Sequence, residues 1–122
     1  AGKRRVWRAS TDFHSWTNSD FADDEDAQTA LGWLRRDYVR QCALRTEQWL
    51  DAEAAWPAEW VDQLGFGDTL LTVTADQLAA FQAELDALTE KYRRIGEGDP
   101  SARRVQLVVQ STPVDLEPPA QP

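Results

Sequence analysis

The sequence has one cysteine, one histidine and no methionine in 122 residues. A single cysteine, Cys42, excludes an internal disulfide and a cysteine-built zinc site, and it fits a reducing compartment, so we expect a cytoplasmic protein. No apolar run approaches the length of a membrane span or of a signal-peptide core, so we expect no membrane partner. The lack of methionine, with strand-like sequence beginning almost at Ala1, indicates a piece cut from a longer protein.

Groups that could perform catalysis are also scarce. His14 is the only histidine, and no Gly-x-Ser-x-Gly elbow accompanies any serine. The glycines at Gly65 and Gly67 lack the third glycine and the following helix of a dinucleotide-binding loop. The acidic cluster at residues 20–26 lacks the Asp-x-Asp-x-Asp-Gly pattern of a calcium loop. We therefore expect no catalytic residues, no metal and no cofactor, and we do not expect an enzyme.

Acidic residues outnumber basic ones, 21 to 13, and the formal net charge is -8. This balance argues against a general attraction of the chain to nucleic acid or to an anionic membrane. The carboxylates at residues 20–26 are best explained by the helix that should follow, because the N-terminal end of a helix dipole favours negative charge.

A long first helix is predicted from about Asp24 to Ala55, and it would end before Pro57. At a rise of 1.5 Å per residue it would be roughly 45 Å long, more than a domain of this size readily covers, so part of it should project or pack on a second copy. A homodimer is therefore expected. The inner face of this helix consists of Ala27, Leu31, Leu34, Tyr38, Cys42, Arg45 and Trp49, widened by Ala30, Trp33 and Leu50.

A second helix should begin at Thr74, which serves as N-cap, with Gln77 completing a capping box. Gly96 is expected to end it in the left-handed conformation. Spacings of three and four place its apolar residues on one stripe, which we expect to lie in the core or in a dimer interface: Leu78, Phe81, Leu85, Leu88, Tyr92 and Ile95.

Three segments read as strands: residues 1–13, 69–73 and 103–111. The expected order is thus β-α-β-α-β. Since two amphipathic helices need a sheet, or each other, to cover their stripes, the predicted fold is α/β (α+β): a two-layer sandwich with a small three-stranded sheet covered by two long helices. We expect residues 1–111 to form one domain and residues 112–122, with four prolines, to form a disordered tail.

Six tryptophans are more than a core of this size needs. Three of them, Trp49, Trp56 and Trp60, crowd the end of the first helix. Aromatic residues that carry a polar group are favoured in ligand pockets and protein interfaces, although core packing is the simpler explanation for Trp33 and Trp49. The ligand or interface candidates are Trp33, Tyr38, Trp49, Trp56 and Trp60.

Several stretches together resemble the C-terminal part of the ArsR-like winged helix-turn-helix transcriptional regulators common in actinobacteria. They are WLDAEAAWPAEW at residues 49–60, LTVTADQL at 71–78, ELDALTEKY at 84–92 and RRVQL at 103–107. GKRRVWRAS at residues 2–10 resembles the passage that leaves the wing of such a DNA-binding domain.

The resemblance implies a DNA-binding domain N-terminal to this piece, so that DNA is contacted through that domain and not through the present residues. The piece itself would supply dimerisation and possible sensing of an unknown small-molecule effector. The cysteine and histidine clusters of metal-sensing members are missing. The alternative is a free-standing small-ligand-binding domain, or a small enzyme using His14, unrelated to transcription.

Overall fold

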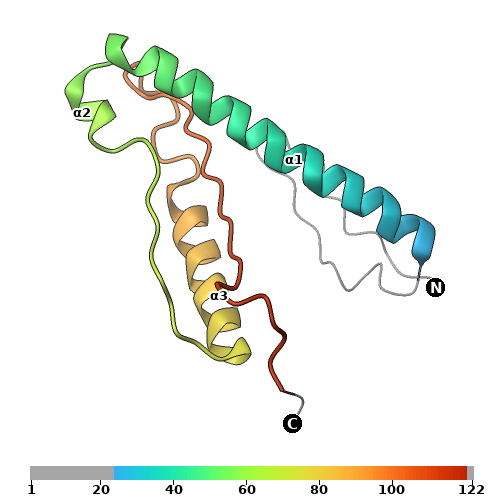
Figure 1. The fold of residues 1–122 in the computed structure, drawn as a ribbon. Coiled ribbons are helices and arrows are strands. Elements are labelled where there is room, and N and C mark those ends of the chain that lie inside the picture. The colour runs from blue at the N-terminus through green and yellow to red at the C-terminus, as the bar shows by residue number, and fades with distance from the viewer. Residues whose placement is uncertain (1–23, 121–122) are drawn as a thin grey trace, which may run out of the picture. The chain divides into compact units, whose positions relative to one another are not determined.

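The computed structural model describes residues 24–120, which belong to two compact units (Figure 1). One unit contains the described residues up to Leu64 together with the segment from Gln106 onward. The other comprises Gly65–Val105. The described residues of each unit include one long helix.

Helix α1, Glu25–Ala52, is the main element of the first unit. The carboxylate of Asp24 caps it by accepting a hydrogen bond of 2.9 Å from the backbone N–H of Ala27, and Glu25 and Asp26 lie in its first turn. The Asp24 carboxylate thus pairs with a backbone N–H that the first turn leaves without a partner. All three acids place negative charge at the positive end of the helix dipole, as predicted. The helix runs without a break through its one glycine, Gly32 (Figure 1).

Part of the predicted inner face of α1 is shielded from water, whereas Leu34 and Arg45 on the same stripe are exposed. Leu31 and Cys42 are 6% and 7% exposed and are the only buried residues in the described part of the chain. Ala27, Tyr38 and Trp49 are partly buried on the same face. Their spacings of four and seven return each side chain to one stripe of the helix.

The chain turns sharply after α1. A short 3-10 helix, η2, spans Glu53–Ala55, and the single-turn helix α2 spans Ala58–Val61. Between them Trp56 is extended, with φ -95 and ψ 149, as the following proline requires. The predicted end of the first helix before Pro57 is thereby confirmed.

Helix α3, Ala75–Tyr92, is the helix of the second unit. The predicted capping box is present: the Thr74 hydroxyl accepts from the Gln77 N–H at 3.2 Å, and the Gln77 side chain accepts from the Thr74 N–H at 2.9 Å. The expectation for Gly96 was wrong, because the helix ends at Tyr92 and passes into turns over residues 93–98. The glycine with positive φ in this region is Gly98, at φ 89.

The predicted α/β sandwich is wrong for the described residues, which are helical or irregular and form no sheet. Residues 69–73 and 103–111, both predicted as strands, are irregular, and apolar side chains such as Leu70 and Leu107 remain exposed. A strand needs a second strand to bond its N–H and C=O groups, and neither segment has such a neighbour within residues 24–120. The third predicted strand, at residues 1–13, lies outside the described residues.

Candidate functional site

Three tryptophans, Trp49, Trp56 and Trp60, form a cluster between the end of α1 and α2. The ring centroids of Trp49 and Trp56 are 5.4 Å apart with the planes inclined by 81°, and those of Trp56 and Trp60 are 5.7 Å apart with an inclination of 79°. Both pairs have the edge-to-face geometry in which the positive edge of one ring meets the negative face of the other. We call these three residues the tryptophan cluster.

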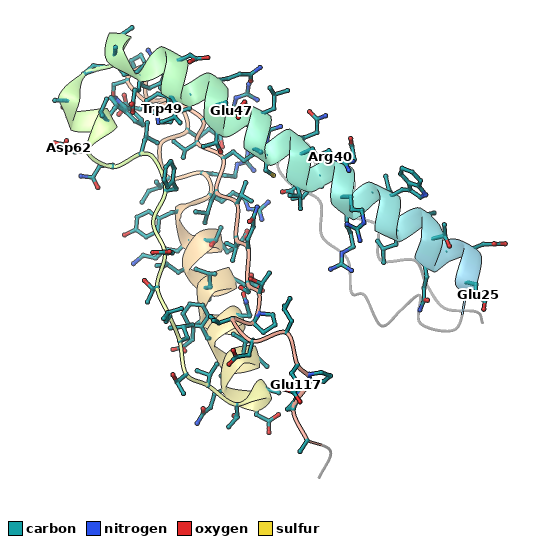
Figure 2. All side chains as sticks on the ribbon, in the orientation of Figure 1. Glu25, Arg40, Glu47, Trp49, Asp62 and Glu117 are labelled. Atoms are coloured by element: carbon teal, nitrogen blue, oxygen red, sulfur yellow. The ribbon has the colours of Figure 1, made fainter. Side chains whose placement is uncertain are left out.

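Local backbone structure brings the three rings together. Trp49 lies in the last turn of α1, near the point where the chain turns back toward Asp62 (Figure 2). The N–H of Trp56 donates to the carbonyl of Glu53 at 3.0 Å, and the N–H of Trp60 donates to that of Pro57 at 3.0 Å. These two tight turns place Trp56 between the other two rings.

The indole nitrogen of Trp49 is an unusual feature of this cluster. Its Nε1 is buried and has no hydrogen-bond acceptor within the described residues. A buried N–H without a partner is costly, and native proteins rarely leave one unpaired. Within the described residues the Trp49 N–H is therefore a buried donor without an acceptor, which marks the tryptophan cluster as a candidate site.

A row of polar contacts continues along the same face of α1 toward its middle. Tyr38 and Cys42 lie one turn apart on this face, where Tyr38 is partly buried and Cys42 is buried. Burial raises the pKa of Tyr38 above its ordinary value, and the charge and hydrogen bond of Cys42 raise it further, whereas Arg45 acts to lower it. The neutral hydroxyl of Tyr38 is thereby favoured.

Arg45 also joins α1 to the C-terminal segment. Its Nη1 donates a hydrogen bond to Oε1 of Gln106, a residue 61 positions later. Sequence reasoning placed Arg45 on the inner face but did not find Gln106 as its partner. Arg45 is exposed, so its charge does not require a buried partner, and the sequence near it carries no signal for a contact 61 positions away.

Helix α3 carries the second candidate surface. Leu78, Phe81, Leu85, Leu88 and Tyr92, which we call the α3 seam, all lie on one face. Phe81 is 40% exposed, and Leu88 and Tyr92 are each 54% exposed. Leu78 and Leu85 are partly buried. The α3 seam is an apolar stripe that the described chain covers only in part.

The remaining candidates do not join these surfaces. Trp33 is 70% exposed and lies 16 residues before Trp49 on α1, which is about 24 Å along the helix axis. His14 and Asp20 lie outside the described residues. Within residues 24–120, no three acidic, histidine or cysteine side chains converge as a metal site would need. No helix of this part is long and apolar enough to cross a membrane.

Comparison with known proteins adds no relative: no family model, curated protein or solved structure matches the chain. The resemblance to ArsR-like regulators therefore stays a prediction from the sequence. The tryptophan cluster and the α3 seam are the two surfaces on which a functional proposal can be based.

Proposed function

We propose that this chain is a homodimerisation module of a winged-helix transcriptional regulator, with the DNA-binding domain N-terminal to it. The observation that carries the proposal is the exposure of the α3 seam, where Phe81, Leu88 and Tyr92 remain 40%, 54% and 54% exposed. A contiguous apolar stripe on a surface marks a site of association, because covering it removes apolar area from water.

The charge of the chain supports the same role. A net charge of -8 disfavours contact with the DNA phosphates. The module would therefore serve dimerisation in the cytoplasm, and another domain would bind DNA. The link to transcription itself depends on the resemblance of residues 49–60, 71–78, 84–92 and 103–107 to ArsR-like regulators.

The tryptophan cluster supports a second role, which is the binding of a small-molecule effector. Its three rings offer apolar faces, and the unpartnered Nε1 of Trp49 offers one hydrogen-bond donor. Apolar walls with a few placed polar groups are the usual composition of ligand sites. The same cluster would equally serve the alternative, a free-standing ligand-binding domain unrelated to transcription, because a ligand site of this kind does not depend on a DNA-binding domain.

Association is tested by size-exclusion chromatography with light scattering on the 122-residue chain and two variants. Leu88→Asp places a charge in the α3 seam, whereas Ala83→Asp places the same charge on the outer face of the same helix. We expect a dimer for the unaltered chain and for Ala83→Asp, and a monomer for Leu88→Asp. Equal behaviour of the two variants would count against an interface at the α3 seam.

A further inference from the structure

We infer that α3 pairs with α3 of a second copy of this chain in an antiparallel orientation, fixed by ion pairs between Glu84 of each copy and Lys91 of the other. This inference rests on the proposed function, because it names the geometry of the dimer that the proposal requires. It follows from the spacing of the α3 seam and from the charges beside it.

The α3 seam has the period of a coiled coil. Successive members are separated by three, four, three and four residues, a mean of 3.5, which is the repeat that keeps two helices in contact along their length. In this repeat Leu78, Leu85 and Tyr92 occupy a positions, and Phe81 and Leu88 occupy d positions. The helix spans 18 residues, enough to present all five.

One acid and one base flank the α3 seam on the same side. Glu84 precedes Leu85 and Lys91 precedes Tyr92, so both occupy g positions, and both are exposed. They are seven residues apart, roughly 10 Å along the axis, too far to pair within one helix. Among the described residues Glu84 makes no ion pair, and the ammonium of Lys91 lies 5.4 Å from the ring of Tyr92.

Other charged residues at the C-terminal end of α3 and just after it form ion pairs within the chain. Glu90 pairs with Arg93 at 3.1 Å, and Glu97 pairs with Arg94 at 2.5 Å. Among the g and e positions that flank the α3 seam, Glu84 and Lys91 are the charged residues, so they are the ones placed to set the orientation of a second helix. Charges at g positions are the ones that set partner and direction in coiled coils.

The antiparallel arrangement satisfies both charges at once. If Leu85 packs opposite Leu88 of the second copy, Phe81 comes opposite Tyr92, and g positions meet g positions. Glu84 then faces Lys91 of the second copy, and the twofold axis repeats this pair. In a parallel arrangement g positions meet e positions, so Glu84 would face Thr89 and gain no opposite charge.

Charge reversal on the full 122-residue chain tests the orientation. Glu84→Lys and Lys91→Glu each turn two attractive pairs into two repulsive ones, so each variant alone should dimerise about tenfold more weakly at low salt. An equimolar mixture of the two should form a heterodimer, and the double variant Glu84→Lys/Lys91→Glu should recover the dimer. Asp86→Lys, with the same charge change on the outer face of α3, should leave the dimer unchanged.

The outcomes separate the inference from the proposal on which it rests. If the unaltered chain is a monomer, both fail. If it is a dimer that Leu88→Asp disrupts, but neither the mixture nor the double variant restores association, the antiparallel pairing alone is overturned. Far-UV circular dichroism of each variant checks that α3 is retained, and added salt should reduce the differences among the charge variants.

Discussion

The ring of Trp56 stands edge-on to the ring of Trp49, with centroids 5.4 Å apart and planes inclined by 81°. Trp56 makes a second contact of the same kind with Trp60, at 5.7 Å. One residue between α1 and α2 therefore links both helices, and the direction in which the chain leaves α1 depends on it.

Replacing Trp56 with alanine should destabilise the first unit, because it removes both edge-to-face contacts. Such contacts are worth about 0.5–1.5 kcal/mol each beyond buried area, so the expected loss is about 1–3 kcal/mol. Urea unfolding followed by circular dichroism measures it. Trp33→Ala is the matched control: that side chain is 70% exposed, and its loss should cost far less. Equal losses would contradict a special role for the tryptophan cluster.

Replacing Thr74 with alanine should weaken the start of α3. The hydroxyl of Thr74 accepts from the N–H of Gln77, and loss of such a cap costs about 1 kcal/mol. Amide hydrogen exchange at Gln77 should become faster. Thr89→Ala removes a different hydroxyl of the same helix, one that bonds the carbonyl of Leu85 instead of a free N–H. It should not accelerate exchange in the first turn, and if it does so as strongly as Thr74→Ala, the capping box is not the cause.

The raised pKa of Tyr38 predicts a loss of stability in alkali. A tyrosine whose pKa is higher in the folded than in the unfolded chain holds its proton more tightly when folded. Its contribution is complete below the ordinary value of 10.0 and disappears as the pH rises through the raised pKa. Denaturant unfolding at neutral and alkaline pH should therefore show a smaller alkaline loss for Tyr38→Phe than for the unaltered chain.

A direct titration checks the same pKa. Tyr92→Phe leaves Tyr38 as the only tyrosine, so ultraviolet absorbance of the tyrosinate reports Tyr38 alone. Its midpoint should lie above that of a free tyrosine. Adding Cys42→Ala removes a neighbour that raises the pKa and should shift the midpoint down. A midpoint that Cys42→Ala leaves in place would show that Cys42 does not act on Tyr38.

The hydrogen bond from Arg45 to Gln106 predicts energetic coupling between α1 and the C-terminal segment. Because the contact is exposed, we expect a coupling of about 0.5 kcal/mol, the lower end of the range for a hydrogen bond. A double-mutant cycle with Arg45→Ala and Gln106→Ala measures it by denaturant unfolding and separates it from the packing of the arginine stem. Strictly additive losses would mean that the segment is not held at Gln106.

The helices were predictable because their signals are local. Asp24, Thr74 with Gln77, and Pro57 act within a few residues of themselves, and a helix satisfies its own backbone groups. The strands predicted at residues 69–73 and 103–111 do not form, because their sequence signal is not sufficient by itself. A β-branched, alternating segment becomes a strand only when another strand bonds to it, and local sequence does not say whether one is present.

The candidate site was predictable in part for the same reason. Trp49, Trp56 and Trp60 are close in sequence, so their gathering could be expected from the helix end. Trp33 was misjudged as part of the inner face: it follows Leu31 by two residues, which turns it about 200° around the helix axis, away from the buried face. The partnership of Arg45 with Gln106 spans 61 positions and has no local signature.

Both the proposed function and the antiparallel pairing of α3 require this chain to assemble with a copy of itself. Sedimentation equilibrium of the unaltered 122-residue chain, over a concentration series reaching tens of micromolar, tests it most directly. We expect a reversible approach to twice the chain mass of 13.8 kDa as concentration rises. A single species of 13.8 kDa at every concentration would contradict it.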